Sequence, residues 1–233
     1  MRSRFLVLFA GLAMMVACNK SVVEVGSSEY LFSESFVSCF FKIDSMMLVS
    51  ESLPTDKEFS FIVQCGFENY YTKQHNEEAY QSYCELYGDT GFNSYLIIPN
   101  QASVNKIQYI KIFSDSDFPN HKAGESLNDL VNIRYETAKP FIDNNYPESW
   151  LGERPIKKDG YRVLAPGEGY VKVEKCVADL SPEELLLIDR NFHILFMEKP
   201  IENKDVTIYL ELRDETQTIK TACRLNFYKD YRE

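Results

Sequence analysis

Positive charge is scarce in this chain, and no stretch combines clustered Lys and Arg with aromatic residues. The 233 residues include 25 Lys and Arg against 35 Asp and Glu, a formal net charge of −10. An acidic surface repels phosphate groups, so the composition argues against nucleic-acid binding. With 45% hydrophobic and 14% aromatic residues, it also excludes disorder for most of the chain.

Common catalytic and metal-binding motifs are also missing. The three histidines form no H-E-x-x-H pattern, no serine lies in a G-x-S-x-G pattern, and no two cysteines have C-x-x-C spacing. We therefore predict no metal, no cofactor and no catalytic residue, and we expect that the protein is not an enzyme.

The one long apolar run stands at the start of the chain, from Phe5 to Ala17, after Arg2 and Arg4. It is too short to cross about 30 Å of hydrocarbon, which takes roughly 18 apolar residues or more. Its length and basic flank are typical of an export signal. Ordinary cleavage after Ala17 would place the bulky Met15 where a small residue is preferred. We predict that residues 1–17 are a signal peptide.

The end of this run, Met15-Val16-Ala17-Cys18, resembles the lipobox of bacterial lipoproteins, in which a small residue precedes an obligatory cysteine. The family usually has Leu where Met15 stands. The resemblance implies that the thiol of Cys18 receives a diacylglycerol and that the signal is removed before it. The new amine is then acylated, and several acyl chains suffice for stable anchoring. Cys18 is the expected lipid anchor; the alternative is an ordinary cysteine.

Residues 18–35 are serine-rich and are expected to form a tether, which leaves residues 36–233 as a single domain. In that domain, apolar and polar residues alternate in several segments, the pattern of a half-buried strand. These segments are residues 37–43, 59–67, 107–113, 170–177, 206–213 and 219–227.

The last two segments predict a hairpin with a defined register. A turn at residues 215–216 pairs Leu212 with Ile219 and sets Glu211 opposite Lys220, an opposite-charge pair on the outer face. The turn contains neither Asn-Gly nor Asp-Gly, the dipeptides preferred in tight hairpins.

Helices are few. Residues 181–191 begin with a Ser-Pro-Glu-Glu capping box and continue into an apolar run, which predicts a helix. A second helix is expected over residues 77–87 and a single turn over 126–131. Residues 139–160 contain three prolines and are expected to form a long loop; a domain boundary there is the alternative.

Several short strands, a few short helices and one long loop are typical of two packed antiparallel sheets. We therefore predict a mainly β fold, an immunoglobulin-like antiparallel β-sandwich. Export permits disulfides among the five cysteines after Cys18, but their spacing indicates no pairing, and they can equally be small buried side chains. They are Cys39, Cys65, Cys84, Cys176 and Cys223.

Residues 109–131 carry a second resemblance. A strand followed by S-x-x-D-F, then H-x-A-G, then Leu-Asn-Asp is similar to lipoproteins of unknown function from Bacteroidetes. The resemblance implies a single exported domain rich in β structure and supplies no catalytic residues.

The same stretch suggests a calcium loop through Asp115 and Asp117. An EF-hand loop would need a liganding oxygen at Pro119, Gly at Asn120 and Glu at Ser126, so it fails at all three positions. We expect a surface turn instead, in which Asp and Asn cap backbone amides.

Other chemical candidates have simpler interpretations. His75 and Cys84 would lie on opposite faces of one helix, and the acidic pairs at residues 77–78 and 183–184 suit helix starts. The tyrosine-rich segments 69–74 and 80–87 can stack on sugars or pack inside the fold, and both interpretations stay open.

The expected function is a lipid-anchored protein of the cell envelope, a binding or structural module for a protein or glycan partner. A fimbrial subunit or anchor, and an envelope hydrolase such as a glycosidase, are the alternatives. Asn19 after the anchor, in place of Asp, favours the outer membrane. Glu24 is the single nearby acid, which favours the periplasmic side over surface display.

Overall fold

The computed structural model describes residues 30–51, 59–152, 156–202 and 205–226. The fold is mainly β, as the sequence predicts, with four sheets and two α-helices in the described ranges. The predicted signal peptide and Cys18 lie outside these residues. Residues 30–35 of the predicted tether belong to the fold, because Leu31–Ser33 is a paired strand and Ser35 is buried.

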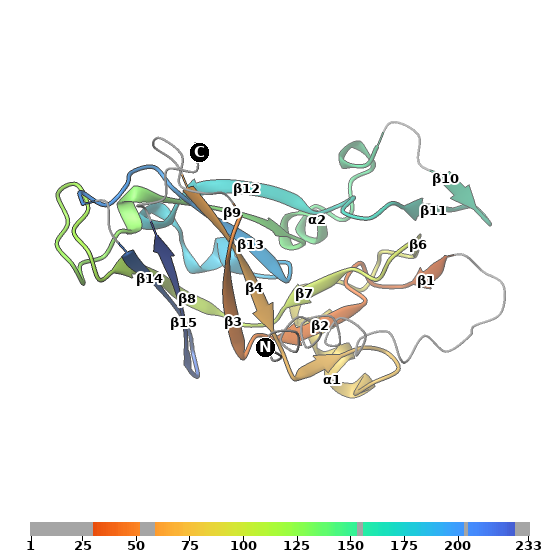
Figure 1. Ribbon diagram of the computed structural model, residues 1–233. Helices are drawn as coiled ribbons and strands as arrows, with labels where there is room; N and C mark the ends of the chain where they lie inside the picture. Colours follow the sequence, from red (N-terminus) through yellow and green to blue (C-terminus); the bar gives the residue numbers. More distant parts are fainter. Residues whose placement is uncertain (1–29, 52–58, 153–155, 203–204, 227–233) are drawn as a thin grey trace, which may run out of the picture.

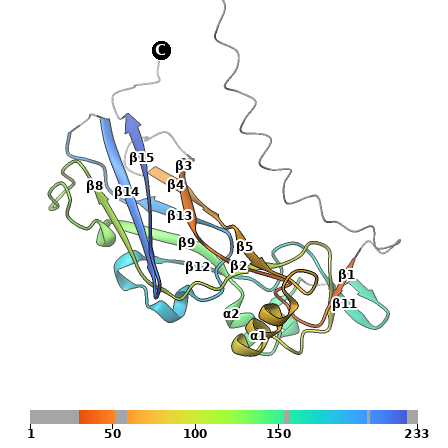
Figure 2. The same ribbon diagram turned by 90° about the horizontal axis from the view of Figure 1, so that it is seen from below.

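Two of the sheets pack face to face and enclose the larger core (Figures 1 and 2). One has five strands in the order β12-β9-β13-β4-β3, and the other has three in the order β15-β14-β8; neighbouring strands run antiparallel throughout. Their bounds are β3 Ser45–Ser50, β4 Phe59–Gly66, β8 Ile107–Ser114, β9 Val131–Thr137, β12 Val171–Cys176, β13 Asn191–Phe196, β14 Asp205–Asp214 and β15 Thr218–Asn226.

The predicted alternation places apolar side chains between the two sheets. On β4, Phe61, Val63 and Cys65 are buried while Gln64 is exposed. Each large apolar side chain that leaves water contributes about 1.5–3 kcal/mol. The facing sheet supplies Ile110, Ile112, Ile208, Leu210, Leu212 and Ile219.

The C-terminal hairpin has the predicted register. Leu212 lies opposite Ile219 and Glu211 opposite Lys220, and the Lys220 Nζ is 2.7 Å from a Glu211 carboxylate oxygen. The turn forms without the preferred dipeptides because hydrogen bonds to Asp214 stabilise it. One carboxylate oxygen of Asp214 accepts the backbone N–H groups of Thr216 and Gln217, at 2.7 and 2.8 Å.

Asp214 also joins the hairpin to two distant segments. Its second carboxylate oxygen accepts the side-chain amide of Asn105 at 2.6 Å. The same amide group binds both the N–H and the C=O of Ile43, just before β3. Burial alone would raise the pKa of Asp214, but the hydrogen bonds from Thr216, Gln217 and Asn105 outweigh it and lower the pKa below its ordinary value.

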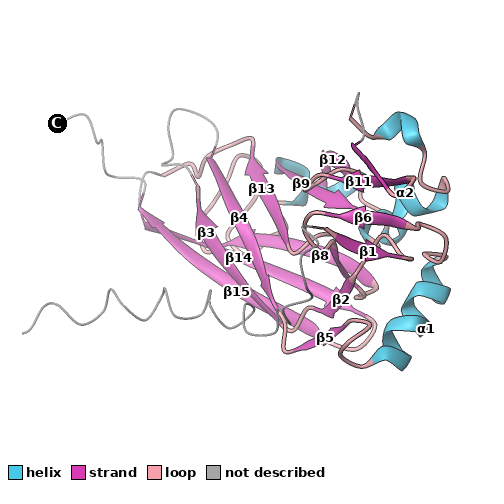
Figure 3. Cartoon of the chain, turned by 90° about the vertical axis from the view of Figure 1, so that its right-hand side faces the viewer, coloured by secondary structure: helices cyan, strands magenta, loops and turns pink. Residues whose placement is uncertain are grey.

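The remaining elements, which we call the distal unit, extend one end of the sandwich (Figure 3). One sheet has the order β1-β6-β11-β10, another the order β5-β2-β7, and two helices pack beside them. Their bounds are β1 Leu31–Ser33, β2 Cys39–Lys42, β5 Asn69–Tyr71, α1 Glu77–Tyr87, β6 Ser94–Leu96, β7 Gln101–Ser103, α2 Lys139–Asp143, β10 Ile156–Lys158 and β11 Tyr161–Leu164.

Strand β2 connects the two cores. The sequence predicts one buried face for residues 37–43, but the neighbours Phe40 and Phe41 are both fully buried. Successive side chains of a strand point to opposite faces, so Phe41 enters the sandwich core and Phe40 enters the core of the distal unit. The chain passes between the two units several times, and no single linker separates them.

The helix predicted over residues 77–87 is confirmed as α1, and the turn predicted over 126–131 is a short 3₁₀ helix at Asn128–Leu130. The helix predicted over 181–191 is wrong beyond residue 185. Its capping box forms, but only the 3₁₀ turn Pro182–Leu185 follows. The next carbonyls are bonded elsewhere, since Leu186 accepts the hydroxyl of Thr137 and Leu187 accepts the N–H of Ala138.

The long loop predicted over residues 139–160 is also corrected. This stretch contains α2, a 3₁₀ turn at Glu148–Trp150 and strand β10. Pro140 stands in the first turn of α2, where its missing N–H has no intrahelical partner to lose. Phe141 and Ile142 are buried in the core of the distal unit, so this segment is part of the packed structure.

Removing the carboxylate of Asp214 should destabilise the protein. Asp214→Ala leaves the buried amide of Asn105 without an acceptor, which costs about 1–3 kcal/mol of unfolding free energy, and it also removes the acceptor of the two partly buried N–H groups of the turn. Glu215→Ala is the control, because Glu215 is exposed and makes only a 3.7 Å ion pair to Lys106. Urea unfolding followed by circular dichroism measures both. Equal midpoints for the two variants would contradict this assignment.

The effect should depend on pH. Because the folded pKa of Asp214 lies below the unfolded value of about 4, its stabilisation is complete above about pH 4. It is lost as the pH falls through the folded pKa. The stability difference between the wild type and Asp214→Asn should therefore narrow in acid.

Candidate functional site

The acidic loop between β8 and β9 is a hydrogen-bonded surface turn, as expected. Asp115 accepts the N–H of Thr207 at 2.8 Å, and Asp117 accepts the N–H of Ala123 and the Lys122 ammonium, both at 2.9 Å. These carboxylates cap backbone amides. Across the described ranges, no group of three or more His, Cys, Asp or Glu residues is placed to hold a metal ion.

The other titratable candidates do not converge. His75 stacks on Tyr70 at the surface, whereas Cys84 is buried in the distal unit and accepts the Ser35 hydroxyl. His193 lies on the outer face of β13 beside Glu51. The Glu184 carboxylate is held by the Lys175 ammonium and the Ser181 N–H, which lower its pKa. The five cysteines after Cys18 are free thiols.

Asp89 is a buried carboxylate that the sequence analysis missed. It is fully buried and accepts the N–H groups of Phe36 and Val37 and the hydroxyl of Tyr146, at 2.7–2.8 Å. Burial raises its pKa, and these three hydrogen bonds offset part of the rise. Its place directly after Gly88, the left-handed residue that ends α1, is the only sequence signal. Asp89 joins α1 to the start of β2 and has a structural role.

Tyrosines of the segment 80–87 pack inside the distal unit. Tyr80 and Tyr87 are buried, and both rings lie against Phe40 with Tyr83 beside them. Of the segment 69–74, Tyr70 is exposed and covered on one side by His75. Packing therefore accounts for segment 80–87, which leaves it no platform for a sugar.

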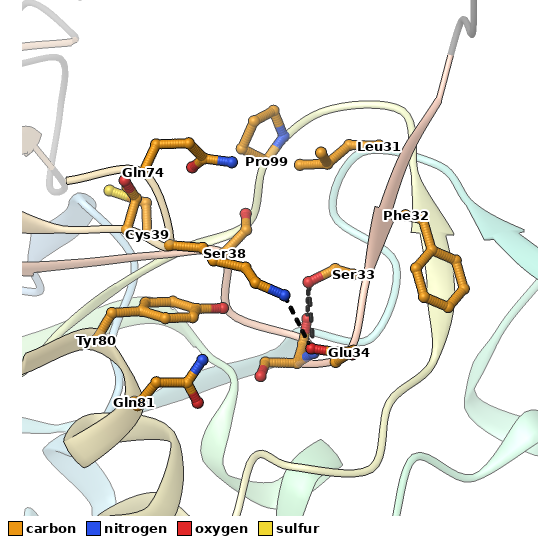
Figure 4. Close-up of a pocket in the computed structure, with 13 residues that line it drawn as sticks. Leu31, Phe32, Ser33, Glu34, Ser38, Cys39, Gln74, Tyr80, Gln81 and Pro99 are labelled. Atoms are coloured by element: carbon orange, nitrogen blue, oxygen red, sulfur yellow. Dashed lines mark hydrogen bonds and ion pairs between the residues drawn. The ribbon is translucent and has the colours of Figure 1, made fainter. Parts of the chain in front are cut away.

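A shallow cavity lies between β1 and α1 (Figure 4). It has a volume of about 200 Å³ and is lined by residues that include Ser33, Cys39, Lys73 and Tyr80. Typical pockets for small ligands have roughly 300–1,000 Å³. The Tyr80 hydroxyl donates to the Val37 carbonyl, and Lys73 is paired with Glu34. The cavity is therefore smaller than a typical ligand pocket, and these two polar groups of its lining are already paired.

The outer face of β8, β14 and β15 carries aromatic rings next to cationic side chains. Phe113 and Tyr209 lie on neighbouring strands with rings stacked at 4.9 Å, and Tyr109 is 41% exposed with the Arg213 guanidinium over its ring. We call this surface the basic–aromatic face. It consists of Tyr109, Lys111 and Phe113 on β8, Tyr209, Glu211 and Arg213 on β14, and Lys220 and Arg224 on β15.

The basic–aromatic face carries a local excess of positive charge. It has four cations, of which Lys220 and Arg224 pair with Glu211 and Asp205. Lys111 and Arg213 lie over aromatic rings, and Lys111 is also directly opposite Glu211 on the neighbouring strand. The surface is therefore basic and apolar in a chain whose net charge is −10. Cross-strand pairing creates it, because Tyr109 and Arg213 are distant in sequence and adjacent in the sheet.

The strand edge beside this face is closed. The Asn128 side chain accepts the N–H of Ile112 at 3.0 Å and donates to the carbonyl of Ile110 at 2.8 Å, in place of a neighbouring strand. Capping of this kind prevents the addition of another chain to an edge.

Comparisons with protein-family models, with curated proteins and with solved structures found no match for this chain. Among the described helices, none is long and apolar enough to cross a membrane. The predicted site residue Cys18 lies outside the described residues.

His121 should titrate at a higher pH than an ordinary histidine. Its Nδ1 donates to the Pro119 carbonyl, which raises its pKa, and its Nε2 lies 2.9 Å from Asp129, which raises it further. Asp129→Asn should lower the pKa of His121, as measured by NMR titration. The stabilisation from protonation is complete below about pH 6.5 and is lost as the pH rises through the folded pKa. An unchanged pKa in the variant would show that Asp129 does not act on the ring.

Proposed function

We propose that this protein is a lipid-anchored module of the bacterial cell envelope that binds a partner and catalyses no reaction. The basic–aromatic face is the observation that carries the binding role. The anchor is Cys18, on the strength of the lipobox-like sequence that ends there. The Asn19 and Glu24 pattern after the anchor supports an outer-membrane location facing the periplasm.

We further propose that the sandwich is immunoglobulin-like. Constant-type immunoglobulin domains have strands A, B, E and D in one sheet and C, F and G in the other. Strand order supports the assignment: β3-β4-β13-β9 corresponds to A-B-E-D, and β8-β14-β15 to C-F-G. β12 is then an added strand beside D. The distal unit is built from the segment before A and from the B–C and D–E connections.

The arrangement of the carboxylates favours binding over hydrolysis. A glycosidase needs two carboxyl groups that face a substrate in a cleft. The fully buried carboxylate of Asp89 and the nearly buried one of Asp214 both accept several internal hydrogen bonds, and neither is directed at a cavity large enough for a sugar. Their chemistry is that of structural anchors.

The ligand that fits the face carries negative charge and a flat apolar surface. Aromatic rings supply contact area, and the cations Lys111 and Arg213 supply charge recognition. An acidic glycan and an acidic protein segment share this chemistry. Separate binding assays with the two kinds of ligand distinguish them.

Replacing Cys18 tests the anchor. Cys18→Ala should abolish labelling by a radioactive fatty acid and leave uncleaved precursor, because both modification and cleavage depend on the thiol. Cys223→Ala, a cysteine on β15, is the matched control and should be labelled and processed like the wild type. Normal labelling of the Cys18 variant would refute the lipoprotein assignment.

Reversing charge on the basic–aromatic face tests the binding role. Lys111→Glu combined with Arg213→Glu should weaken capture of envelope proteins or acidic glycans by about tenfold or more. The matched control is Arg134→Glu with Lys172→Glu, the same charge change on the outer face of the other sheet. Equal capture by both double variants would exclude the face as the binding site.

A further inference from the structure

A second aromatic surface lies at the far end of the distal unit. On the sheet β1-β6-β11-β10, the rings of Phe32, Tyr95 and Tyr161 contact one another, with centroids 5.1–6.5 Å apart. Phe32 is 41% exposed and Tyr161 44%. Lys158 lies over the ring of Tyr95 at 5.0 Å. We call these four residues the distal aromatic patch.

The patch is mounted on a packed sheet. Leu96 and Leu164, which alternate with the patch residues along β6 and β11, are buried in the core of the distal unit. Val163 is nearly buried on the patch side. A supported sheet face therefore presents three amphipathic or apolar rings to the outside.

The charge around the patch differs from that of the whole chain. Residues 156–164 contain three cations and one acid, whereas the chain carries −10. Of these cations only Lys158 lies on the patch face, because Lys157 and Arg162 pair on the opposite face of the β10–β11 hairpin, and the Tyr95 hydroxyl donates to Asp159 at 3.2 Å. Aromatic side chains with one apolar and one polar end, flanked by cations, are favoured at the boundary between lipid and water. A cation close to an anionic lipid surface is attracted to it.

The chain enters the fold beside this patch. Tyr30 directly precedes β1, and Phe32 of the patch is a residue of β1. Tyr30 is the twelfth residue after Cys18. At no more than about 3.5 Å per residue, even a fully extended segment keeps the patch within about 40 Å of the anchored cysteine. The opposite end of the molecule carries β8, β14 and β15 (Figures 1 and 2).

We propose that the distal aromatic patch rests on the lipid head groups of the bilayer in which Cys18 is anchored. This inference depends on the proposed lipid anchor. The acyl chains hold the protein at the membrane, and the patch determines which end faces it. The acidic bulk of the domain is then turned away from the anionic surface, and the basic–aromatic face stays free for its partner.

Tryptophan fluorescence tests this orientation, because Trp150 is the only tryptophan of the chain. Two variants carry Trp150→Phe together with Phe32→Trp or Tyr109→Trp, which place one reporter on the patch or on the basic–aromatic face. Each protein is produced from the full chain in a bacterial host and reconstituted into vesicles of brominated phosphatidylcholine and phosphatidylglycerol. Flotation with the vesicles reports anchoring, and quenching by bromine reports contact with lipid.

Both variants should float with the vesicles. Only the tryptophan at position 32 should show a blue-shifted emission and a strong loss of fluorescence. Adding Lys158→Glu should reduce that loss. Flotation without quenching at position 32 would overturn the docking while leaving the anchor intact. A blue shift without quenching would overturn it in favour of a second copy on the patch.

Two further results would also overturn the orientation. Quenching at position 109 alone would place the basic–aromatic face on the lipid. Failure to float would refute the lipid anchor itself, and with it the docking that depends on the anchor. Circular dichroism of each variant verifies that the fold is retained.

Discussion

The hydrogen bonds between Asp214, Asn105 and Ile43 connect the parts of this structure. They join the C-terminal hairpin to the chain just before β8 and just before β3. All three residues lie where the sandwich meets the distal unit. The Asp214 carboxylate, the Asn105 amide and the Ile43 backbone groups are buried or hydrogen-bonded there. Removing one partner would leave others unsatisfied in a medium of low polarity, so the junction behaves as one unit.

The two hydrophobic cores depend on the same connection. Phe40 and Phe41 are adjacent on one strand and contribute to different cores, so neither core can loosen without moving the other. Asp89 reinforces the second core by holding the start of β2 against the end of α1. The distal unit is therefore built onto the sandwich as an extension of its loops. The surface of the distal unit therefore has a fixed orientation relative to the two sheets of the sandwich.

Charge is distributed unevenly over this framework. The chain is acidic, but two surfaces with aromatic rings and cations lie at its opposite ends: the basic–aromatic face and the distal aromatic patch. The basic–aromatic face lies on the outer side of the proposed immunoglobulin-like sandwich. The distal aromatic patch lies next to the point where the chain enters the fold. An anchored domain that meets the membrane with one end and its partner with the other would use both surfaces at once.

Local sequence was sufficient for features that depend on neighbouring residues. Alternation of apolar and polar residues identified β4, β14 and β15. The same alternation set the register of the hairpin, because a slip of one residue would turn the apolar face of one strand to water. The assignment of Cys18 as lipid anchor rests on local sequence alone. The helix predicted over residues 181–191 was wrong because the carbonyls of Leu186 and Leu187 bond to a distant segment.

Tertiary structure decided everything that requires distant residues to meet. Nothing near Asp89 in the sequence indicates that it binds the amides of Phe36 and Val37, and nothing near Asp214 indicates its bond to Asn105, because these donors come from other segments. The basic–aromatic face exists because β8 and β14 pair antiparallel and bring Tyr109 beside Arg213. The distal aromatic patch likewise joins four strands, β1, β6, β10 and β11, from three separate parts of the chain. Sequence alone indicated strands such as β4, β14 and β15; the folded sheets determined which side chains share a surface.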